Sequence, residues 1–490
     1  TPLYSSAASD VYKRQGRGDD QVSKELRRVS LVVAAMFISL FIAGTLLQAV
    51  NTEAVANDPR NVRSIYESYK TQRGPILVDG KPIAESVPAD NAYRYLRSYD
   101  NEIYSAVTGY FSVFRGATGM ESAANAYLSG QSSSQFFEQV NAVLSGNPVT
   151  GAAVELTLDP NLQQAAWDAL GDYRGALIAI DPVTGNILAM VSKPGYNVNK
   201  IAGHDSEKVR ENYVELESDP ASPLINKTIS GDLYHPGSVF KLVVAAAALE
   251  SGGYTNDSTF QNPVSVRLPN STSEVFNSSR RACGSDSTVT LIYAMRFSCN
   301  VPFVELGLAL GQERLRAQAE LFGFGKEIRV PMLATPSVFP EEMDDAQLGL
   351  SSFGQFDVRV SPLQMALVSS AIANGGLMMQ PNLIESVISP NLSVIASPQP
   401  EVLSQPITAA TATALKKMMV QSVSKGVASN ASITGVKVAG KTGTAENGEG
   451  ERVTLWFTGF APSVDPRVAI ALVIEDGGGR DSGASGNGTA

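Results

Sequence analysis

An apolar segment near the start of the chain constrains the fold most. Residues 29–50 read VSLVVAAMFISLFIAGTLLQAV and carry no charge. As a helix they would extend about 33 Å, which is enough to cross the hydrocarbon core of a bilayer. Lys24, Arg27 and Arg28 precede this segment. By the positive-inside rule, we expect residues 1–28 to be a cytoplasmic tail and everything after the segment to lie outside the plasma membrane.

A cleaved signal peptide is the competing interpretation of the same segment. Ala54, Val55 and Ala56 resemble a small-x-small cleavage site. The apolar run is longer than the ~7–15 residues of a signal-peptide core, so we expect an uncleaved single-pass anchor over residues 29–50. Residues 1 to about 18 show no initiator Met and no periodicity. We expect them to be an artefact of the sequence without a structural role.

Composition excludes several classes of site. The chain has 38 Lys and Arg against 48 Asp and Glu, a formal charge of −10, which is the wrong sign for a nucleic-acid-binding protein. Cys283 and Cys299 are the two cysteines, too few for a cysteine-built zinc or iron–sulfur site. His204 and His235 are the two histidines, so a site with three His ligands is excluded by count.

The part after the apolar segment divides into two regions, because 490 residues are too many for one ordinary domain. Residues 51–153 are expected to form a small non-catalytic domain that contains a β-hairpin around Asp79 and Gly80. Residues 154–490 are expected to form the larger domain. Its expected strands are a hairpin at 175–192 and three segments at 435–446, 453–462 and 467–476. Strands at both ends, with mostly helical sequence between them, favour an α+β fold.

Ser238 and Lys241 are the first candidate catalytic pair. Pro236 and Gly237 precede them, and an Ala/Leu/Val-rich run predicts a helix over residues 238–250. Residues three apart project from one face of a helix. A serine hydroxyl needs a base to become a nucleophile, and a lysine can be that base if burial or nearby positive charge lowers its pKa. Alone the pair is weak, because a serine helix cap followed by a solvated lysine gives the same pattern.

Two further segments strengthen this interpretation. Ser298, Cys299 and Asn300 form a Ser-x-Asn segment, and residues 441–444 read Lys-Thr-Gly-Thr at the end of a predicted strand. Penicillin-recognising serine enzymes carry a Ser-x-x-Lys, a Ser-x-Asn and a Lys-Thr-Gly in this order. Here the order and the local context agree, namely a helix start, a loop and a strand. The three segments together predict an acyl-serine enzyme.

With these motifs the chain resembles the class B penicillin-binding proteins, the peptidoglycan D,D-transpeptidases, and within them the actinobacterial penicillin-binding protein A group. The likeness extends over nearly all of residues 27–490, including the segments DPVTGNILAMVSKPGY, GQFDVRVSPLQMALVSSAIANGG and WFTGFAP. It implies a serine β-lactamase-like transpeptidase fold, an antiparallel sheet flanked by helices, for residues 154–490. It implies a pedestal or dimerisation-like domain for residues 51–153. The departures are Cys299 within the Ser-x-Asn and His235 where a second proline is more usual.

The resemblance also implies roles for the motif residues. Ser238 would attack the D-Ala-D-Ala carbonyl of a stem peptide, Lys241 would act as general base, and Ser298 would relay a proton. The substrate-binding residues would be Asn300, Lys441, Thr442, Gly443 and Thr444. An amine from a neighbouring stem peptide would resolve the acyl-enzyme, whereas a β-lactam would block it. No metal or organic cofactor is implied.

Cys283 and Cys299 are a candidate disulfide. They lie outside the membrane in the predicted topology, where disulfides form and persist. A bond between them would tie down the Ser-x-Asn loop. Two free thiols are the alternative, which the sequence leaves open because it does not show how closely the Cβ atoms approach.

Two other functions stay open. A D,D-carboxypeptidase would transfer the acyl group to water, and the motifs do not distinguish acceptors. A penicillin-binding scaffold or sensor would acylate without turnover. A bifunctional enzyme is rejected because residues 51–153 are too few for a glycosyltransferase domain, and a class A β-lactamase because we find no deacylating glutamate motif between Asn300 and Lys441.

The resemblance finally implies partners and a missing element. The partners would be peptidoglycan stem peptides, β-lactam antibiotics and a membrane glycan polymerase of the shape, elongation, division and sporulation family. Relatives follow their last strands with a helix that packs on the sheet. That helix is not evident after residue 476, so we expect the chain to be truncated at its C-terminus and part of the sheet to be uncovered.

Overall fold

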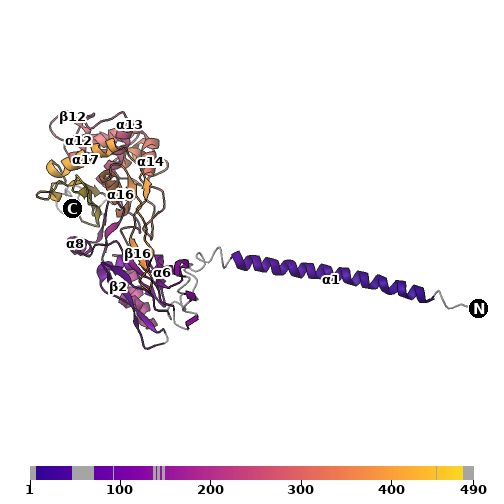
Figure 1. The fold of residues 1–490 in the computed structure, drawn as a ribbon. Coiled ribbons are helices and arrows are strands. Elements are labelled where there is room, and N and C mark those ends of the chain that lie inside the picture. The colour runs from indigo at the N-terminus through magenta and orange to yellow at the C-terminus, as the bar shows by residue number, and fades with distance from the viewer. Residues whose placement is uncertain are drawn as a thin grey trace, which may run out of the picture. The chain divides into compact units, whose positions relative to one another are not determined.

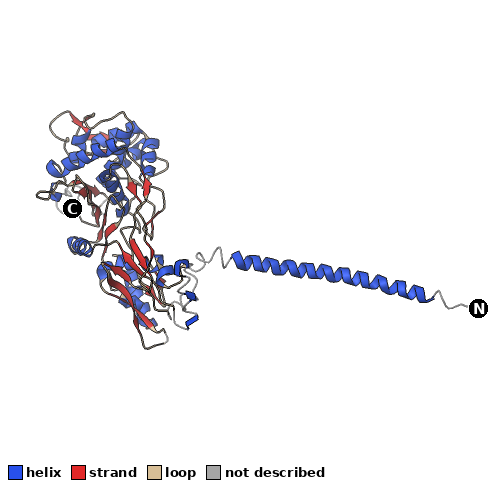
Figure 2. Ribbon diagram, viewed as in Figure 1, coloured by secondary structure: helices blue, strands red, loops and turns tan. Residues whose placement is uncertain are grey.

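The computed structural model describes residues 7–46, 71–91, 93–135, 139–140, 144–145, 149–448 and 450–477. The chain divides into two compact units, Thr1–Ile65 and Tyr66–Ala490. The described part of the first unit is one long helix, drawn in indigo in Figure 1. The second unit contains a six-stranded and a five-stranded sheet with helices around them (Figure 2).

The helix of the first unit, α1 (Ala7–Thr45), contains a segment that suits a membrane. Its last part, Leu26–Thr45, is 20 residues long, and by length and composition it is apolar enough to cross a membrane. None of this segment is buried by other parts of the structure. An apolar surface of this kind, left uncovered by protein, is what a lipid environment would cover.

The helix extends beyond the predicted anchor over residues 29–50. It begins at Ala7, within the residues 1 to about 18 to which we assigned no structural role. No proline interrupts residues 7–45, and good helix formers such as Lys24, Glu25 and Leu26 precede the apolar run, so the helix continues N-terminally. The expected end of the anchor, at residue 50, lies outside the described residues.

The six-stranded sheet of the second unit has the strand order β17-β16-β6-β1-β2-β3. Its strands are β1 (Ile76–Val78), β2 (Lys81–Pro88), β3 (Tyr95–Tyr99), β6 (Ala153–Leu156), β16 (Ile384–Ile388) and β17 (Val394–Ala396). The hairpin predicted around Asp79 and Gly80 is confirmed as β1–β2, and both turn residues have positive φ, as a two-residue hairpin turn requires. β6 pairs with β1 on one side and with β16 on the other. The boundary expected between residues 153 and 154 therefore falls inside a strand of this sheet.

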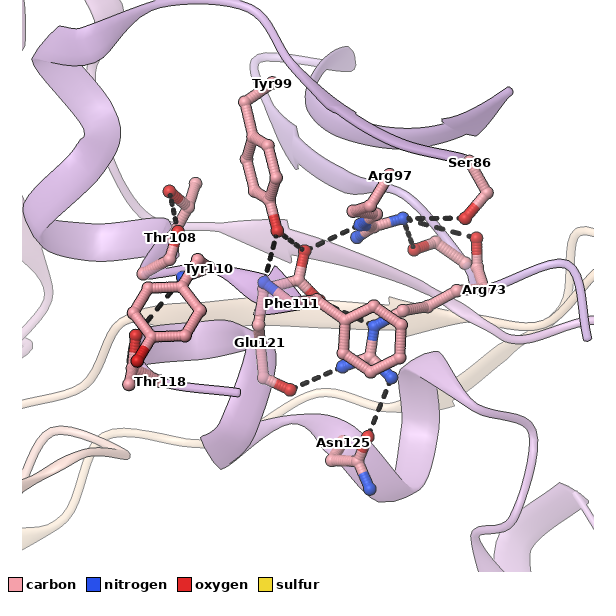
Figure 3. A network of polar contacts seen from close by, with 12 residues as sticks. Arg73, Ser86, Arg97, Tyr99, Thr108, Tyr110, Phe111, Thr118, Glu121 and Asn125 are labelled. Atoms are coloured by element: carbon pink, nitrogen blue, oxygen red, sulfur yellow. Dashed lines mark hydrogen bonds and ion pairs between the residues drawn. The ribbon is translucent and has the colours of Figure 1, made fainter. Parts of the chain in front are cut away.

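A buried ionic cluster lies beside this sheet (Figure 3). Glu121, in α5 (Gly119–Ala123), accepts hydrogen bonds from Nε of Arg73 and Nε of Arg97, both at 2.6 Å. The Tyr99 hydroxyl donates to the same carboxylate at 3.1 Å. Burial by itself would raise the pKa of Glu121, but the charges of Arg97 and Arg73 outweigh burial and lower that pKa. The charged carboxylate ties α5 to β3 and to the segment before β1.

The five-stranded sheet is antiparallel throughout, in the order β19-β20-β21-β7-β8. Its strands are β7 (Gly175–Ile180), β8 (Ile187–Lys193), β19 (Ala439–Ala445), β20 (Thr454–Ala461) and β21 (Val468–Ile474). The predicted hairpin and the three predicted C-terminal strands are thus confirmed. Alternating residues face opposite sides, because successive side chains of a strand point to opposite faces. On one face Ala179 and Val191 pack against Leu170 of α8 (Pro160–Leu170), and on the other Ile178 and Trp456 join the main core.

Most of the helices lie between β8 and β19 in the sequence. They are α9 (Asn199–Ala202), α10 (Ser206–Ser218), η4 (Gly237–Phe240), α11 (Lys241–Glu250), α12 (Leu291–Phe297), α13 (Val301–Leu310), α14 (Gln312–Leu321), α15 (Asp345–Ser351), α16 (Pro362–Ala373), α17 (Ala409–Lys425) and η5 (Ser429–Ala431). Every residue of α16 is buried, and its Met365 carbonyl accepts from the Thr458 hydroxyl of β20 at 3.0 Å. Strands at both ends with helices between them confirm the predicted α+β arrangement.

Short elements fill the remaining described chain. Near the six-stranded sheet these are η2 (Glu102–Tyr104), α4 (Ser105–Thr108), β4 (Phe111–Ser112), β5 (Gly116–Ala117), α6 (Asn125–Leu128) and η3 (Ser133–Gln135). Among the helices they are β9 (Thr259–Gln261), β10 (Ser265–Arg267), β11 (Glu274–Phe276), β12 (Thr288–Thr290), β13 (Ile328–Arg329), β14 (Leu333–Ala334), β15 (Met378–Met379) and β18 (Val402–Ser404). The expected loss of a C-terminal helix concerns residues 478–490, which lie outside the described residues.

Candidate active site

The candidate nucleophile lies in a tight turn at the start of a buried helix. Ser238 is the second residue of η4, and α11 follows directly, so the predicted helix over 238–250 is confirmed with a 3-10 first turn. Gly237 has a φ of 52° and its N–H donates to the Gly354 carbonyl at 2.8 Å. A Cβ at Gly237 would lie 2.5 Å from the Thr444 carbonyl oxygen. Backbone contacts on two sides therefore fix the position of Ser238.

Lys241 is fully buried beneath this serine. Its Nζ lies 3.0 Å from Ser238 Oγ. The same nitrogen lies 2.8 Å from the Ser298 carbonyl oxygen and 2.8 Å from Asn300 Oδ1. The structure thus brings the Ser-x-x-Lys and Ser-x-Asn segments together around one amine.

The third segment meets the other two through a second lysine. Lys441 lies on β19, the edge strand of the five-stranded sheet, and is also fully buried. Its Nζ donates to Ser298 Oγ at 2.7 Å and to the Thr442 carbonyl at 2.8 Å. Ser298 Oγ is 3.4 Å from Lys241 Nζ as well, so this hydroxyl lies between the two lysines.

Both lysines have a lowered pKa. Burial, followed by the nearby charge of Lys441, holds the pKa of Lys241 well below its ordinary value. Burial alone lowers the pKa of Lys441 to about 7. Removing a charged amine from water disfavours its protonated form, and a second positive charge adds to this effect. The site therefore favours a neutral amine at Lys241, which is the form that can accept a proton.

An uncommon backbone conformation positions Ser298 in the site. It caps the C-terminal end of α12 with a φ of 58°, in the left-handed region that side chains other than glycine rarely adopt. Cys299 follows, and it forms a disulfide with Cys283, with Cα atoms 6.0 Å apart. This is the pairing that the sequence offered as a candidate. The bond joins the Ser-x-Asn loop to the segment between β11 and β12.

A cavity of about 600 Å³ opens above these groups. Six of the predicted residues line it, namely Ser238, Ser298, Asn300, Thr442, Gly443 and Thr444. Lys241 and Lys441 lie below its surface, where they contact the lining hydroxyls. The structure thus places all eight predicted catalytic and substrate-binding residues in or under one cavity.

Other walls of the cavity were not predicted. One wall is the segment around β11, with Glu274, Phe276, Asn277 and Arg280, and another holds Phe353, Gln355 and Phe356. Gln355 and Phe356 belong to a segment quoted for the family resemblance, whereas nothing local marked Phe353 or residues 274–280. His235, next to the nucleophile turn, has its Nδ1 3.2 Å from the Val358 carbonyl oxygen. Within the described ranges, no group of three or more His, Cys, Asp and Glu could hold a metal ion.

Comparisons with known proteins agree with this geometry. Residues 175–490 match the penicillin binding protein transpeptidase domain family, and residues 73–154 match the penicillin binding protein A dimerisation domain family. The peptidoglycan D,D-transpeptidase PbpA of Mycolicibacterium smegmatis is 38% identical over 475 residues, which cover 95% of this chain and 96% of that protein.

Solved structures give the same result. The crystal structure of PBPA from Mycobacterium tuberculosis has a TM-score of 0.82 at 36% identity, covering 86% of this chain and 97% of that chain. The penicillin G acyl-enzyme complex of the same M. tuberculosis protein has a TM-score of 0.81, also at 36% identity, with the same coverage of both chains. From its sequence, its fold and the arrangement of its three motifs, this chain belongs to the penicillin-binding protein transpeptidase family.

Proposed function

We propose that the chain is a monofunctional, class B peptidoglycan D,D-transpeptidase, which cross-links stem peptides through an acyl-serine intermediate. The observation that carries this is the distance of 3.0 Å between Ser238 Oγ and the Nζ of the buried Lys241, at the floor of the 600 Å³ cavity. The names of the M. smegmatis and M. tuberculosis relatives, and the acyl-enzyme complexes of the latter, support the same chemistry.

Acylation begins at Lys241. A neutral amine has two N–H groups and one lone pair. The Ser298 carbonyl and Asn300 Oδ1 can only accept hydrogen bonds, so they take the two N–H groups. The lone pair is left to accept the hydroxyl proton of Ser238. As that proton moves to Nζ, Ser238 Oγ attacks the carbonyl between the two D-Ala residues of the donor stem peptide.

The tetrahedral intermediate then collapses with loss of D-Ala. The C–N bond of the donor breaks, and the leaving nitrogen takes a proton that originates on Lys241 Nζ. Ser298 Oγ, between the two lysines, is placed to pass this proton along. We assign the oxyanion hole to the backbone N–H groups of Ser238 and Thr444, where one such donor typically contributes ~3–4 kcal/mol to the transition state. The edge position of β19 leaves backbone N–H groups that point away from β20.

The remaining motif residues bind the substrate. Thr442 and Thr444 line the cavity beside the buried Lys441, an arrangement suited to the terminal carboxylate of the donor. Gly443 also lines the cavity, and a Cβ there would lie 2.9 Å from the Pro236 carbonyl oxygen, so glycine at this position lets β19 lie close to the nucleophile turn. The Asn300 amide nitrogen donates one N–H to the Phe276 carbonyl at 2.8 Å, so its second N–H is the one assigned to the substrate backbone.

The second half-reaction transfers the acyl group to an amine. The amine of a neighbouring stem peptide attacks the ester carbonyl, the new amide bond forms, and the bond to Ser238 Oγ breaks. The proton lost by the amine returns to Ser238 through Lys241. A β-lactam forms the same ester, but its leaving nitrogen stays tethered in the opened ring and hinders the second half-reaction.

We further propose where the enzyme lies in the cell, and the apolar part of α1 supports this proposal. We place Leu26–Thr45 across the plasma membrane with the preceding Lys24 inside and residues 66–490 outside. Residues 51–153 are assigned to a non-catalytic domain that contacts partners, including a membrane glycan polymerase of the shape, elongation and division family. Protease treatment of intact cells tests the orientation, since cleavage of the catalytic part from outside is expected and full protection would contradict it.

Product analysis tests the proposed reaction. The chain is incubated with a donor peptide that ends in D-Ala-D-Ala and an amine acceptor, with Ser238→Ala as control. We expect a cross-linked product and free D-Ala from the wild type and neither from the variant. A donor that only loses D-Ala to water would show a D,D-carboxypeptidase instead. A β-lactam adduct without any turnover of donor would show a penicillin-binding scaffold.

A further inference from the structure

A buried asparagine outside the three motifs contacts the Ser-x-Asn loop. Asn277 follows β11 directly and is 3% exposed. Its Oδ1 accepts hydrogen bonds from the backbone N–H groups of Asn300 at 2.8 Å and of Val301 at 3.2 Å. Its Nδ2 donates to the Arg281 carbonyl at 3.0 Å. All three polar contacts are with backbone groups, and two of them belong to the catalytic loop.

These contacts supply a cap that α13 lacks in its own sequence. Asn300 is the N-cap residue of α13, but its side chain makes no capping hydrogen bond. The first N–H groups of a helix have no partner within the helix, and a side-chain oxygen usually satisfies them. Asn277 does so here from a distant strand end. The Asn300 side chain is thereby left for other contacts.

The side chain of Asn300 is used at the catalytic lysine. Its Oδ1 accepts from Lys241 Nζ, and its Nδ2 donates to the carbonyl of Phe276, the neighbour of Asn277. Residues 276 and 277 thus hold both the backbone and the amide of Asn300. The orientation of that amide determines which atom faces Lys241, because turning it over would present an N–H where the lysine needs an acceptor.

We propose that Asn277 is a positioning residue for the acylation of Ser238, which it promotes by fixing Asn300 so that Oδ1 meets the amine of Lys241. This inference rests on the proposed function, since it assigns a residue to the same reaction. Asn277 itself touches no reacting atom. It acts through the loop that carries two of the acceptors of Lys241, the Ser298 carbonyl and Asn300 Oδ1.

The surroundings of Lys241 make this role measurable. Lys441 is the charged side chain that affects its pKa, from the strand side. The loop side presents uncharged oxygens of Ser298 and Asn300, and α13 presents the Phe303 ring, 5.4 Å from Nζ. A carboxylate introduced at position 277 would be separated from Lys241 Nζ only by Asn300, which contacts both. It would favour the charged lysine and raise the pKa of Lys241.

Two variants and one control test the proposal in the full chain. Asn277→Ala removes the cap, and Asn277→Asp keeps an oxygen acceptor for both N–H groups while adding a negative charge. Gln163→Ala is the matched control, because Gln163 is also buried and also bridges backbone groups, those of Ile103 and Met190, with bonds of 2.8–2.9 Å. The measurements are the rate of acylation by a fluorescent penicillin across neutral pH and the melting temperature.

We expect Asn277→Ala to acylate at least about tenfold more slowly than Gln163→Ala at a similar melting temperature, because a displaced catalytic group costs rate beyond the loss of stability. We expect Asn277→Asp to melt closer to the wild type and to shift its acylation profile to higher pH. Equal acylation rates of Asn277→Ala and Gln163→Ala, or an unshifted profile for Asn277→Asp, would overturn the assignment. A wild-type chain that does not acylate would instead contradict the proposed function.

Discussion

Lys241 and Lys441 are both fully buried, and Ser298 Oγ lies within 3.4 Å of one amine and 2.7 Å of the other. Burial lowers the pKa of each, and the charge of Lys441 lowers that of Lys241 further. The pKa of Lys441 is about 7, so Lys441 gains its proton as the pH falls below neutral. Its positive charge then opposes protonation of the neighbouring Lys241. The protonation of these two lysines therefore predicts that the rate of acylation of Ser238 depends on pH.

Replacement of Lys441 should move this dependence. Lys441→Met removes a positive charge beside Lys241, so the pKa of Lys241 rises and less of it is neutral at a given pH. We expect the rising limb of the acylation rate to shift to higher pH. Lys437→Met, at an exposed lysine just before the same strand, should leave the limb in place. An unshifted limb in Lys441→Met would contradict the electrostatic role given to this residue.

The buried carboxylate of Glu121 contributes to the stability of the fold. Arg73 and Arg97 contact its carboxylate in a site without solvent, so Glu121→Gln leaves two buried guanidinium groups with no compensating charge. We expect a loss of about 3 kcal/mol in the free energy of unfolding, the lower range for breaking a buried ion pair. Denaturant unfolding measures it, and Glu85→Gln, at an exposed position of β2, is the control. Equal midpoints for the two variants would contradict this prediction.

At the scale of elements, the nucleophile turn depends on close backbone contact. A Cβ at Gly354, where φ is 80°, would collide with the Gly237 carbonyl. We expect Gly354→Ala to slow acylation by about 100-fold, since a displacement of about 1 Å at a reacting group can cost that much. Gly252→Ala is the control, because its φ of 72° imposes similar strain but nothing lies within 4 Å. An acylation rate in Gly354→Ala equal to that of Gly252→Ala would contradict the contact model.

Sequence patterns predicted elements whose signals are local. The hairpins β1–β2 and β7–β8, the three C-terminal strands and α11 each follow from apolar periodicity bounded by turn residues. The three motifs likewise identified the groups around Ser238. No local pattern identified Asn277, because its role depends on the contact between the end of β11 and the start of α13, which only the folded chain brings together. The contact of Gly354 with Gly237 and the position of Ser298 between two lysines were hidden for the same reason.

At the scale of the whole molecule, one sheet joins distant parts of the chain. β6 lies between β1 and β16, so the sheet next to the Glu121 cluster includes strands from residues 384–396. Local patterning placed a boundary between residues 153 and 154, because pairing between strands so far apart in sequence cannot be read from either strand alone. The region matched as a dimerisation domain, residues 73–154, thus shares its sheet with the region that carries the site.

This sharing predicts the behaviour of a fragment. Residues 73–154 expressed alone would keep only the first two residues of β6, so β1 would lose most of its pairing with β6, and β6 would lose its pairing with β16. The freed edge would expose apolar surface. We expect no cooperative thermal transition from this fragment by circular dichroism. Residues 66–490, which keep β16 and β17, are the control and should unfold cooperatively. A cooperative transition in the short fragment would show that it folds independently.

The most direct test of the account is intact-mass spectrometry of the chain after exposure to penicillin G, with Ser238→Ala beside it. The account predicts one covalent adduct on the wild type and none on the variant, because Ser238 Oγ lies 3.0 Å from the amine that activates it. The adduct should persist, since the tethered leaving group hinders deacylation. An adduct of equal yield on Ser238→Ala, or none on folded wild-type protein, would contradict Ser238 as the nucleophile.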